Sequence, residues 1–147
     1  MRPSLARLYQ VVTSSTAPVW LALILAPRSR LARRLAAVAP ALAAGLGAVY
    51  GGLLVASSRD GERVDFRSAD SVRAGLASGP GFVAGWTHMV ALDLVAGRWI
   101  WETGLTEGRS TRVALLLTWF TGPLGVLWFA AQRRLRPRPS TSARPTG

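Results

Sequence analysis

Two residue types on which much protein chemistry depends are absent from this sequence, which has no cysteine and no lysine. Without cysteine, the chain can form no disulfide, thiolate metal site or iron–sulfur cluster. Without lysine, it can form no Schiff base with a substrate or a retinal chromophore. A single histidine, His88, is too few for a multi-histidine metal centre or for paired axial haem ligands. We therefore expect neither a metal site nor a cofactor.

The sequence is also poor in acidic residues, with 7 Asp and Glu against 18 basic residues that are all arginine. The net charge of +11 is a feature that nucleic-acid-binding proteins share. Here, however, the arginines cluster beside long hydrophobic stretches, and 50% of all residues are hydrophobic. Arginines in that position orient a membrane protein and meet anionic lipid headgroups. We therefore expect membrane lipids, and no nucleic acid, as partners of the charged surface.

Four hydrophobic stretches are each long enough to cross a bilayer as a helix. They predict membrane spans at residues 8–26, 35–56, 82–101 and 113–131. The predicted fold class is an all-α integral membrane protein, with a compact four-helix transmembrane bundle as a single domain over residues 1–134. Ser68 is placed to cap a short interfacial helix that runs to about Ala77, before the third span. Residues 135–147 are basic and rich in proline, which predicts a disordered tail.

Four spans place both termini on one side of the membrane. The N-terminus, the second loop and the tail together carry 11 arginines, whereas the first and third loops carry 6. Because cytoplasmic segments carry the excess of basic residues, this count predicts that both termini are cytoplasmic. The four arginines of the short first loop favour the reverse orientation. The lysine-free, alanine-rich composition indicates a bacterium with a GC-rich genome, so we expect the bacterial inner membrane.

The third span contains two ionisable residues, His88 and Asp93. An ionised side chain such as aspartate at mid-membrane depth costs about 2.5–3.5 kcal/mol, so such residues face a bundle interior or a wet cavity and mark functional sites by default. On a straight helix, these two lie about 140° apart in rotation and about 7.5 Å apart in rise. They are therefore not predicted to form a hydrogen-bonded pair. We expect each to meet a different neighbour, from the hydroxyls of the first span, Tyr50, Thr118 and Thr121.

Two features of the first and second spans have more than one interpretation. Pro18 interrupts the first span, either as a packing kink or as a polar notch that faces the ionisable residues of the third span. Ala43, Gly47 and Gly51 form a ridge of small side chains on the second span. Such a ridge predicts that another helix approaches closely.

Two further features lie in the third and fourth spans. Arg98 is near the end of the third span, where it is either a headgroup anchor or an ion-pair partner of Glu102. A Gly122-Pro123 pair lies near the centre of the fourth span. Pro123 frees the carbonyl of Trp119 from its helical hydrogen bond, which predicts a local break in the helix.

Several motifs of the sequence resemble those of a known family. The third span reads W-x-H-x4-D-L-x3-R from Trp86 to Arg98, and the fourth contains G-P-L-G at residues 122–125. The first span ends in P-V-W-L-A-L-I-L-A-P-R at residues 18–28. Together these motifs resemble the abscisic-acid-deficient-four-like family of four-span membrane proteins, over residues 8–134. The family is named for a plant chloroplast protein that is required to make neoxanthin from violaxanthin. The chain departs from it in lacking a plastid transit peptide.

The resemblance implies carotenoid chemistry within a membrane. The plant conversion opens an epoxide and removes a proton to leave an allene, so it needs an acid at the oxygen and a base at the carbon. His88 and Asp93 are the matching positions that can transfer protons, which makes them the catalytic candidates. Trp86, Arg98 and Trp119 are the candidates for binding a carotenoid or another apolar polyene.

The resemblance also leaves an alternative open. The second hypothesis is a non-catalytic membrane protein that binds a carotenoid or lipid, or that scaffolds an enzyme complex. Both hypotheses are compatible with a homo-oligomer or an enzyme complex. Because a bacterium need not contain violaxanthin, the sequence leaves open both the substrate and whether the chain is an enzyme.

Overall fold

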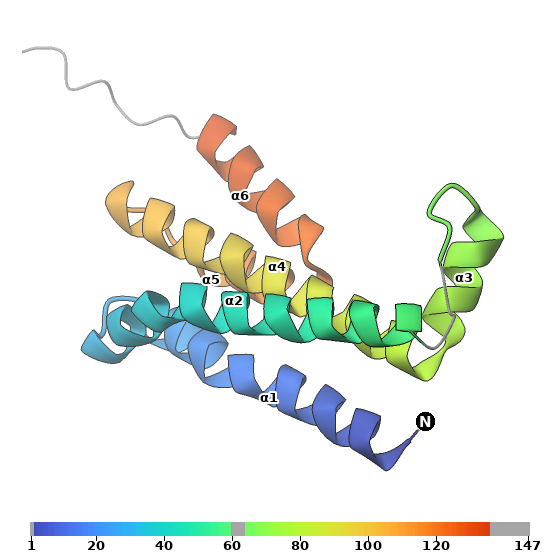
Figure 1. The fold of residues 1–147 in the computed structure, drawn as a ribbon. Helices are drawn as coiled ribbons and strands as arrows, with labels where there is room; N and C mark the ends of the chain where they lie inside the picture. The colour runs from blue at the N-terminus through green and yellow to red at the C-terminus, as the bar shows by residue number, and fades with distance from the viewer. Residues whose placement is uncertain (1, 60–63, 136–147) are drawn as a thin grey trace, which may run out of the picture.

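All secondary structure that the computed structural model describes, over residues 2–59 and 64–135, is helical (Figure 1). The helices are α1 (Pro3–Leu25), α2 (Arg30–Arg59), α3 (Ala69–Ala77), α4 (Gly79–Thr106), α5 (Arg112–Thr121) and α6 (Pro123–Leu135). The predicted all-α class is therefore confirmed. Apart from Leu135, which ends α6, the predicted tail lies outside the described residues.

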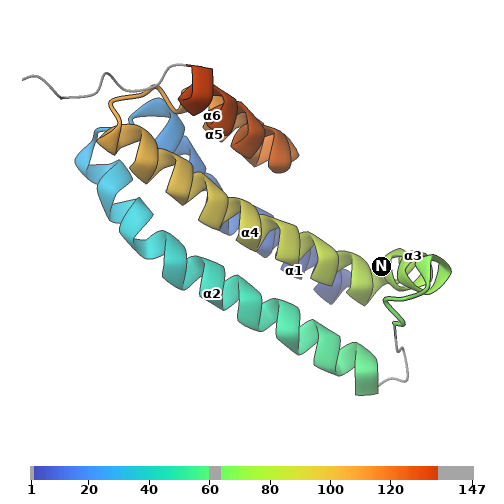
Figure 2. The same cartoon turned by 90° about the horizontal axis from the view of Figure 1, so that it is seen from above.

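The three long helices, α1, α2 and α4, run side by side (Figures 1 and 2). They contain 23, 30 and 28 residues, which corresponds to lengths of about 35, 45 and 42 Å. The turn between α1 and α2 is closed by hydrogen bonds from Ser29 N to Ala26 O and from Ala32 N to the Ser29 hydroxyl. The chain reverses direction there, so α2 is antiparallel to α1, and α4 returns antiparallel to α2.

The core of the protein lies where α1 and α4 meet the last two helices. Its largest buried side chains include Trp20, Leu23, Ile100, Leu115 and Phe129. The six-membered ring of Trp20 lies directly over Gly97, where a Cβ atom would collide with it. α1 and α4 approach closely at this point because α4 has no side chain there.

Within the small-residue ridge of α2, Ala43 packs partly against the core, but Gly47 and Gly51 face open space among the described residues. A Cβ atom on Gly47 or Gly51 would meet nothing within 4 Å. The buried residues of α2 are Ala32, Ala36, Ala39 and Leu46, and these face its neighbours. The predicted packing role of Gly47 and Gly51 is therefore wrong within the described chain, because no atom of a neighbouring helix comes within 4 Å of a Cβ at either position.

The short helix predicted before the third span is present as α3. Ser68 is its N-cap, and the Ser68 hydroxyl accepts a hydrogen bond from Ser71 N. Ser78 ends α3 and caps α4, since its hydroxyl accepts a hydrogen bond from Gly81 N. Just before α3, the ring of Phe66 is 77% exposed. An exposed aromatic ring beside a short helix is typical of segments that lie on a membrane surface.

The fourth predicted span is a helical hairpin and not one helix. Gly122 follows α5 with φ 60° and ψ −96°, and α6 begins at Pro123. α6 packs back along α5, with Gly125 against the backbone of Ala114. The two helices are about 15 and 20 Å long, and each is too short for a hydrocarbon core of about 30 Å. The single span predicted over residues 113–131 is thus replaced by two helices that begin and end at the same end of the bundle, because glycine permits a sharp turn.

Charged side chains tie the end of α6 to the loop between α4 and α5. Glu107 forms ion pairs with Arg109 and Arg133, each at 2.7 Å. Arg109 also donates a hydrogen bond to Gln132 O at 3.1 Å. Desolvation acts to raise the pKa of Glu107, but hydrogen bonds from Arg133 and Arg109 outweigh it and bring the pKa below its usual value. Glu107 is therefore an anion at neutral pH and holds α6 beside this loop.

The hairpin places the two ends of the described chain at opposite ends of the bundle. Arg112, at the start of α5, donates a hydrogen bond to Leu25 O at the end of α1. Trp101, near the end of α4, donates to Pro27 O at 2.9 Å. The end of α6 therefore lies near the α1–α2 turn, whereas the N-terminus lies at the α3 end (Figure 2). This arrangement differs from four full spans, which bring both termini to one side.

Two of the described helices, α1 and α2, are long and apolar enough to cross a membrane. α4 has a similar length, but His88, Asp93 and Arg98 interrupt its apolar sequence. The four-helix transmembrane bundle is therefore not confirmed. The described chain has three long helices, a short capped helix and a hairpin.

Alanine substitutions at two glycines test the close contact between α1 and α4 and the open face of α2. Alanine at Gly97 would collide with the ring of Trp20, so Gly97→Ala should lower the free energy of unfolding by about 1–3 kcal/mol. Alanine at Gly47 meets open space and has a higher helix propensity, so Gly47→Ala should be neutral or stabilise the protein by up to about 1 kcal/mol. Thermal unfolding of both variants in detergent measures the difference. Equal losses of stability would contradict the outward orientation of the α2 ridge.

Candidate functional site

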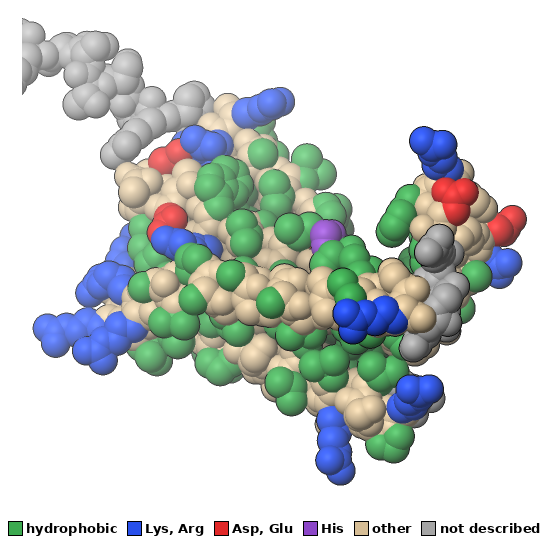
Figure 3. Space-filling view, in the orientation of Figure 1, with side chains coloured by type: hydrophobic (Ala, Val, Ile, Leu, Met, Phe, Trp, Pro, Cys, Tyr) green, Lys and Arg blue, Asp and Glu red, His purple; other side chains and the backbone are tan. Residues whose placement is uncertain are grey.

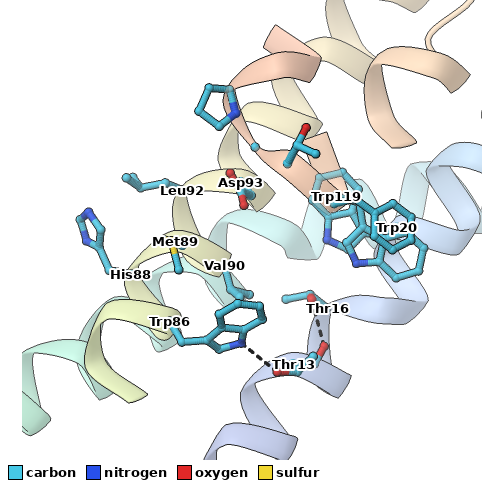
Figure 4. Close-up of a pocket in the computed structure, with 14 residues that line it drawn as sticks. Thr13, Thr16, Trp20, Trp86, His88, Met89, Val90, Leu92, Asp93 and Trp119 are labelled. Carbon is cyan, nitrogen blue, oxygen red and sulfur yellow. Dashed lines mark hydrogen bonds between the residues drawn. The ribbon is translucent and has the colours of Figure 1, made fainter. Parts of the chain in front are cut away.

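A cavity of about 510 Å³ opens beside α4, at the level of the α5–α6 turn (Figure 4). It is lined by Thr13, Thr16 and Trp20 of α1, by α4 residues between Trp86 and Asp93, and by the hairpin from Trp119 to Pro123. Its volume lies within the range of roughly 300–1,000 Å³ that is typical of small-molecule sites. Helices far apart in the sequence therefore meet around a space of ligand size.

Asp93 is the only carboxylate among the described residues that line this cavity. Its side chain points toward the α5–α6 turn (Figure 4), where a Cβ atom on Gly122 would lie 2.7 Å from Asp93 Oδ1. The carboxylate thus occupies the space that a side chain at Gly122 would need. α6 begins at Pro123, so the positive end of a helix dipole lies beside this carboxylate. Asp93 is half-buried and accessible from the cavity.

Three tryptophans form the aromatic walls of the cavity. Trp20 and Trp119 stack with ring centroids 6.1 Å apart and planes at 8°. Trp86 donates its indole N–H to the Thr13 hydroxyl at 2.9 Å, and Thr13 donates in turn to Tyr9 O. These hydrogen bonds fix the orientation of Trp86. Trp86 and Trp119, both predicted to bind substrate, therefore line the same cavity.

The polar part of α1 faces the cavity. Thr13 and Thr16 both line it, and Thr16 donates a hydrogen bond to Thr13 O at 3.3 Å. Pro18 lies within α1 one turn further along the chain. Pro18 itself is exposed and does not line the cavity, so the structure leaves both interpretations of Pro18 open. The hydroxyls of Thr13 and Thr16, however, lie where neighbours of Asp93 were expected.

His88 lies at the rim of the cavity with an exposed side chain. Its ring packs on Tyr50, one of its predicted neighbours, with ring centroids 5.0 Å apart. The side chain points away from Asp93 (Figure 4). Within the described chain, no hydrogen bond joins the two catalytic candidates, as their helical spacing predicted.

Arg98 lies outside this cavity, about one turn beyond Asp93. Its Nη2 donates to Glu102 Oε1 at 2.7 Å, so the predicted ion pair is present. Arg98 and Pro40 line a separate groove of about 210 Å³. The Nε atom of Arg98 is buried and has no hydrogen-bond partner among the described residues. The structure therefore does not bring Arg98 together with the other predicted substrate-binding residues.

An apolar groove of about 360 Å³ follows the outer face between α2 and α4. Its floor consists of small side chains, Ala43, Ala44, Gly47 and Ala91. His88 and Leu92 line both this groove and the main cavity. These two residues of α4 thus border both spaces.

Sequence reasoning did not select Trp20 or Gly122 as residues of the site, whereas the hydroxyls of the first span, which include Thr16, were expected near the ionisable residues. A signal for Gly122 was present, since a Gly-Pro pair in the middle of a predicted span indicates a break. No sequence signal pairs Trp20 with Trp119, because that contact depends on the direction in which the hairpin folds. Among the residues that the structure describes, no group of three His, Asp or Glu side chains is placed to hold a metal ion.

The helices and the cavity define a class: a helical protein with apolar helices of bilayer length and an aromatic cavity around one carboxylate. The family model of the ABA DEFICIENT 4-like proteins matches residues 7–129 of the chain, which include every residue that lines the cavity. The protein therefore belongs to the ABA DEFICIENT 4-like family, as its motifs predicted. No curated protein and no solved structure matches the chain.

Alanine substitutions at Gly122 and Gly108 distinguish two causes of lost stability at the α5–α6 turn, namely the strain of a positive φ and a collision with Asp93. Both have a positive φ, at 60° and 65°, so replacement by alanine should cost each roughly 1–2 kcal/mol of stability. Only Gly122→Ala adds a collision with Asp93, whereas a Cβ atom on Gly108 meets nothing within 4 Å. Gly122→Ala should therefore lower the unfolding temperature more than Gly108→Ala does.

The added substitution Asp93→Ala should relieve part of the loss caused by Gly122→Ala, because it removes the colliding carboxylate. The double variant is compared with the single variants by thermal unfolding in the same detergent. Strictly additive losses would show that the two side chains do not compete for this space.

Proposed function

We propose that this protein modifies a carotenoid within a membrane and that Asp93 transfers the proton in the reaction. The observation that carries this proposal is the position of Asp93, which is the carboxylate of an aromatic cavity of ligand size. Membership of the ABA DEFICIENT 4-like family supports it, because the family resemblance implies the opening of a xanthophyll epoxide.

The proposed reaction is an isomerisation of an epoxide to an allenic alcohol. A base removes one proton from a carbon of the polyene, the released electron pair forms a new carbon–carbon double bond, and the epoxide carbon–oxygen bond breaks. The oxygen then takes up a proton. Atoms and electrons balance, so the reaction needs no oxidant or reductant. An ionised Asp93 accepts the proton from carbon and, once protonated, donates it to the oxygen.

The aromatic walls suit this reaction in two ways. Breaking the epoxide bond develops positive charge on carbon, and a tryptophan face attracts a cation with about 0.5–2 kcal/mol. Trp86 and Trp119 are only half-buried and line the cavity that contains Asp93. Trp20, by contrast, stacks behind Trp119 and is 2% exposed. An apolar cavity also limits the access of water, which would otherwise add to the electron-poor carbon and divert the reaction to a diol.

A carotenoid is longer than the main cavity, so only its reactive end ring fits beside Asp93. The apolar chain of the substrate then lies in the groove between α2 and α4. That groove has a floor of alanine and glycine and shares the lining residues His88 and Leu92 with the cavity. In this arrangement, His88 contacts the polyene near the reacting carbon, and Trp86 and Trp119 hold the ring. Arg98 and Glu102 then lie along the path of the chain and not at the reacting end.

The second candidate function is a non-catalytic membrane protein that binds a carotenoid or lipid, or that scaffolds an enzyme complex. One observation favours it: the small-residue ridge around Gly47 and Gly51 is open. Ridges of this kind pack against other helices in membranes. A second copy of the chain or another membrane enzyme is the kind of partner that this ridge fits.

The hairpin leads us to propose an orientation in which the two termini lie on opposite sides of a bacterial inner membrane. The arginines at the end with the α1–α2 turn are Arg28, Arg30, Arg33, Arg34, Arg109, Arg112, Arg133 and Arg134. Those described at the other end are Arg2, Arg7, Arg59, Arg67 and Arg73. Because cytoplasmic ends carry the excess of arginine, this count supports an orientation with the α1–α2 turn and the end of α6 in the cytoplasm and the N-terminus outside.

Asp93→Asn tests the proposed chemistry. Asparagine keeps the size and the hydrogen-bonding ability of the side chain, but it does not accept a proton in the relevant pH range. Conversion of a supplied epoxy-xanthophyll should therefore fall by about 10²-fold or more, the scale for a positioned acid or base. The readout is the carotenoid composition of a host that makes candidate xanthophylls, with folded protein measured by monodisperse purification.

Two variants serve as comparisons for Asp93→Asn. Asp70→Asn removes an exposed carboxylate of α3 and should leave conversion unchanged. His88→Gln tests the second catalytic candidate by the same readout. Wild-type conversion by folded Asp93→Asn protein would rule out proton transfer by Asp93. A wild-type protein that binds xanthophylls without converting any of them would favour the second candidate function.

The absence of cysteine makes the orientation directly testable. Ser4→Cys, Ser110→Cys and Leu135→Cys each introduce the only thiol of the chain. A membrane-impermeant maleimide should label the first of these from the periplasm and the other two from the cytoplasmic side of inverted vesicles. Labelling of Ser4→Cys and Leu135→Cys from the same side would contradict the hairpin arrangement and restore four full spans.

A further inference from the structure

A second, polar cavity lies at the arginine-rich end of the bundle, away from Asp93. It has a volume of about 370 Å³ and forms where the α1–α2 turn meets the loop between α4 and α5. Arg28, Arg109 and Arg112 line it, together with Ser110 and Thr111. Figure 3 shows the basic side chains gathered at this end of the molecule. Three guanidinium groups around one polar cavity are suited to bind a phosphate or carboxylate, because two oxygens of such an anion can accept parallel hydrogen bonds from one arginine.

The charge around this cavity is strongly positive. Glu107 is the acidic side chain of the adjoining loop, and it is shared between Arg109 and Arg133. Arg112 donates to Leu25 O at 3.3 Å and leaves its other donors available. Arg28 takes part in no ion pair with the described residues. Among the described residues, neither Arg28 nor Arg112 pairs with a carboxylate, so an anion in the cavity would meet two guanidinium charges that no described acidic side chain neutralises.

The hydroxyl of Thr111, at the start of α5, points to the same kind of ligand. Thr111 is the N-cap of α5 and is only 3% exposed, yet its side chain makes no capping hydrogen bond. Its methyl group packs against Gly104. Thr111 lines the cavity, and its hydroxyl has no hydrogen-bond partner among the described residues, so it is available to a ligand there. The first backbone N–H groups of α5 also lack helical partners, as at any helix start.

We propose that this cavity binds a phosphate group. Arg28 and Arg112 contribute charge-assisted hydrogen bonds, and the Thr111 hydroxyl and the amino end of α5 supply further donors. A phosphate bound there contacts both the α1–α2 turn and the start of α5, which is the open end, or base, of the α5–α6 hairpin. Two sources share this chemistry: the headgroup of an anionic phospholipid, and free phosphate. The site is independent of the carotenoid reaction, because none of these residues lines the cavity that contains Asp93.

Ligand-dependent stability of the full chain in a neutral detergent tests the proposal. A ligand that binds only the folded protein raises the unfolding temperature by mass action. The probes are dioctanoyl phosphatidylglycerol, dioctanoyl phosphatidylcholine and sodium phosphate, with sodium chloride at matched ionic strength as the baseline. Phosphatidylglycerol or phosphate should stabilise the wild type at concentrations at which phosphatidylcholine and chloride do not.

Variants inside and outside the cavity distinguish a specific phosphate site from a general attraction of anions to the arginine-rich end of the bundle. Thr111→Val keeps the methyl group against Gly104 and removes the hydroxyl, and Arg28→Gln removes an exposed guanidinium. Each should weaken the apparent affinity about tenfold, the usual scale for a hydrogen bond to a charged group. Arg34→Gln removes the same charge from the same end but outside the cavity, so it should leave the affinity unchanged.

Each outcome decides the proposal. Stabilisation by phosphatidylglycerol alone, lost in Thr111→Val and Arg28→Gln, assigns the site to a lipid headgroup. The same pattern with sodium phosphate assigns it to free phosphate. No stabilisation by either probe overturns the proposal. An Arg34→Gln variant that weakens binding as much as Arg28→Gln also overturns it, because the effect then belongs to the charge of the whole end.

Discussion

The backbone turn at Gly122, with φ 60° and ψ −96°, determines how the last two helices of the described chain are arranged. A residue with a side chain rarely adopts such a positive φ, and here its Cβ atom would also meet Asp93. Because glycine permits the turn, an apolar stretch long enough to cross a bilayer reverses at its centre. α6 then packs along α5, and the turn itself closes one side of the cavity.

A helix break inside an apolar environment needs internal partners for its backbone groups. Gly122 N donates to Thr118 O at 2.8 Å, and Gly125 N donates to Gly122 O at 3.1 Å. The carboxylate of Asp93 lies against the same turn, where the start of α6 offers a positive dipole. The turn and the carboxylate therefore support each other. Asp93 has a structural setting that explains how an ionisable residue is kept inside the bundle, and the same setting exposes it to the cavity.

The hairpin also connects two sites of different chemistry. Its turn borders the aromatic cavity around Asp93. Its base borders the arginine cavity, and ion pairs of Glu107 with Arg109 and Arg133 hold that base in place. Polar groups are thus segregated along the bundle, with one carboxylate at its middle and a cluster of arginines at one end. This segregation is what a bilayer requires, because isolated charge is costly at its centre and stable at its surface.

The sequence alone determined the all-helical class and the Ser68 cap, because apolar runs and capping residues exert their effect over a few neighbouring positions. It also determined the family membership, because the motifs of the family are short stretches of sequence. Helical spacing also determined that His88 and Asp93 point apart. The tertiary structure decided what depends on contacts between distant segments. It turned the Gly47 ridge outward and Trp20 toward Gly97, although both helices are apolar on several faces. It also folded residues 113–131 back on themselves, since a Gly-Pro pair in the sequence permits a kink or a reversal, and contacts between distant residues, such as Gly125 against α5 and the ion pairs of Glu107, accompany the reversal.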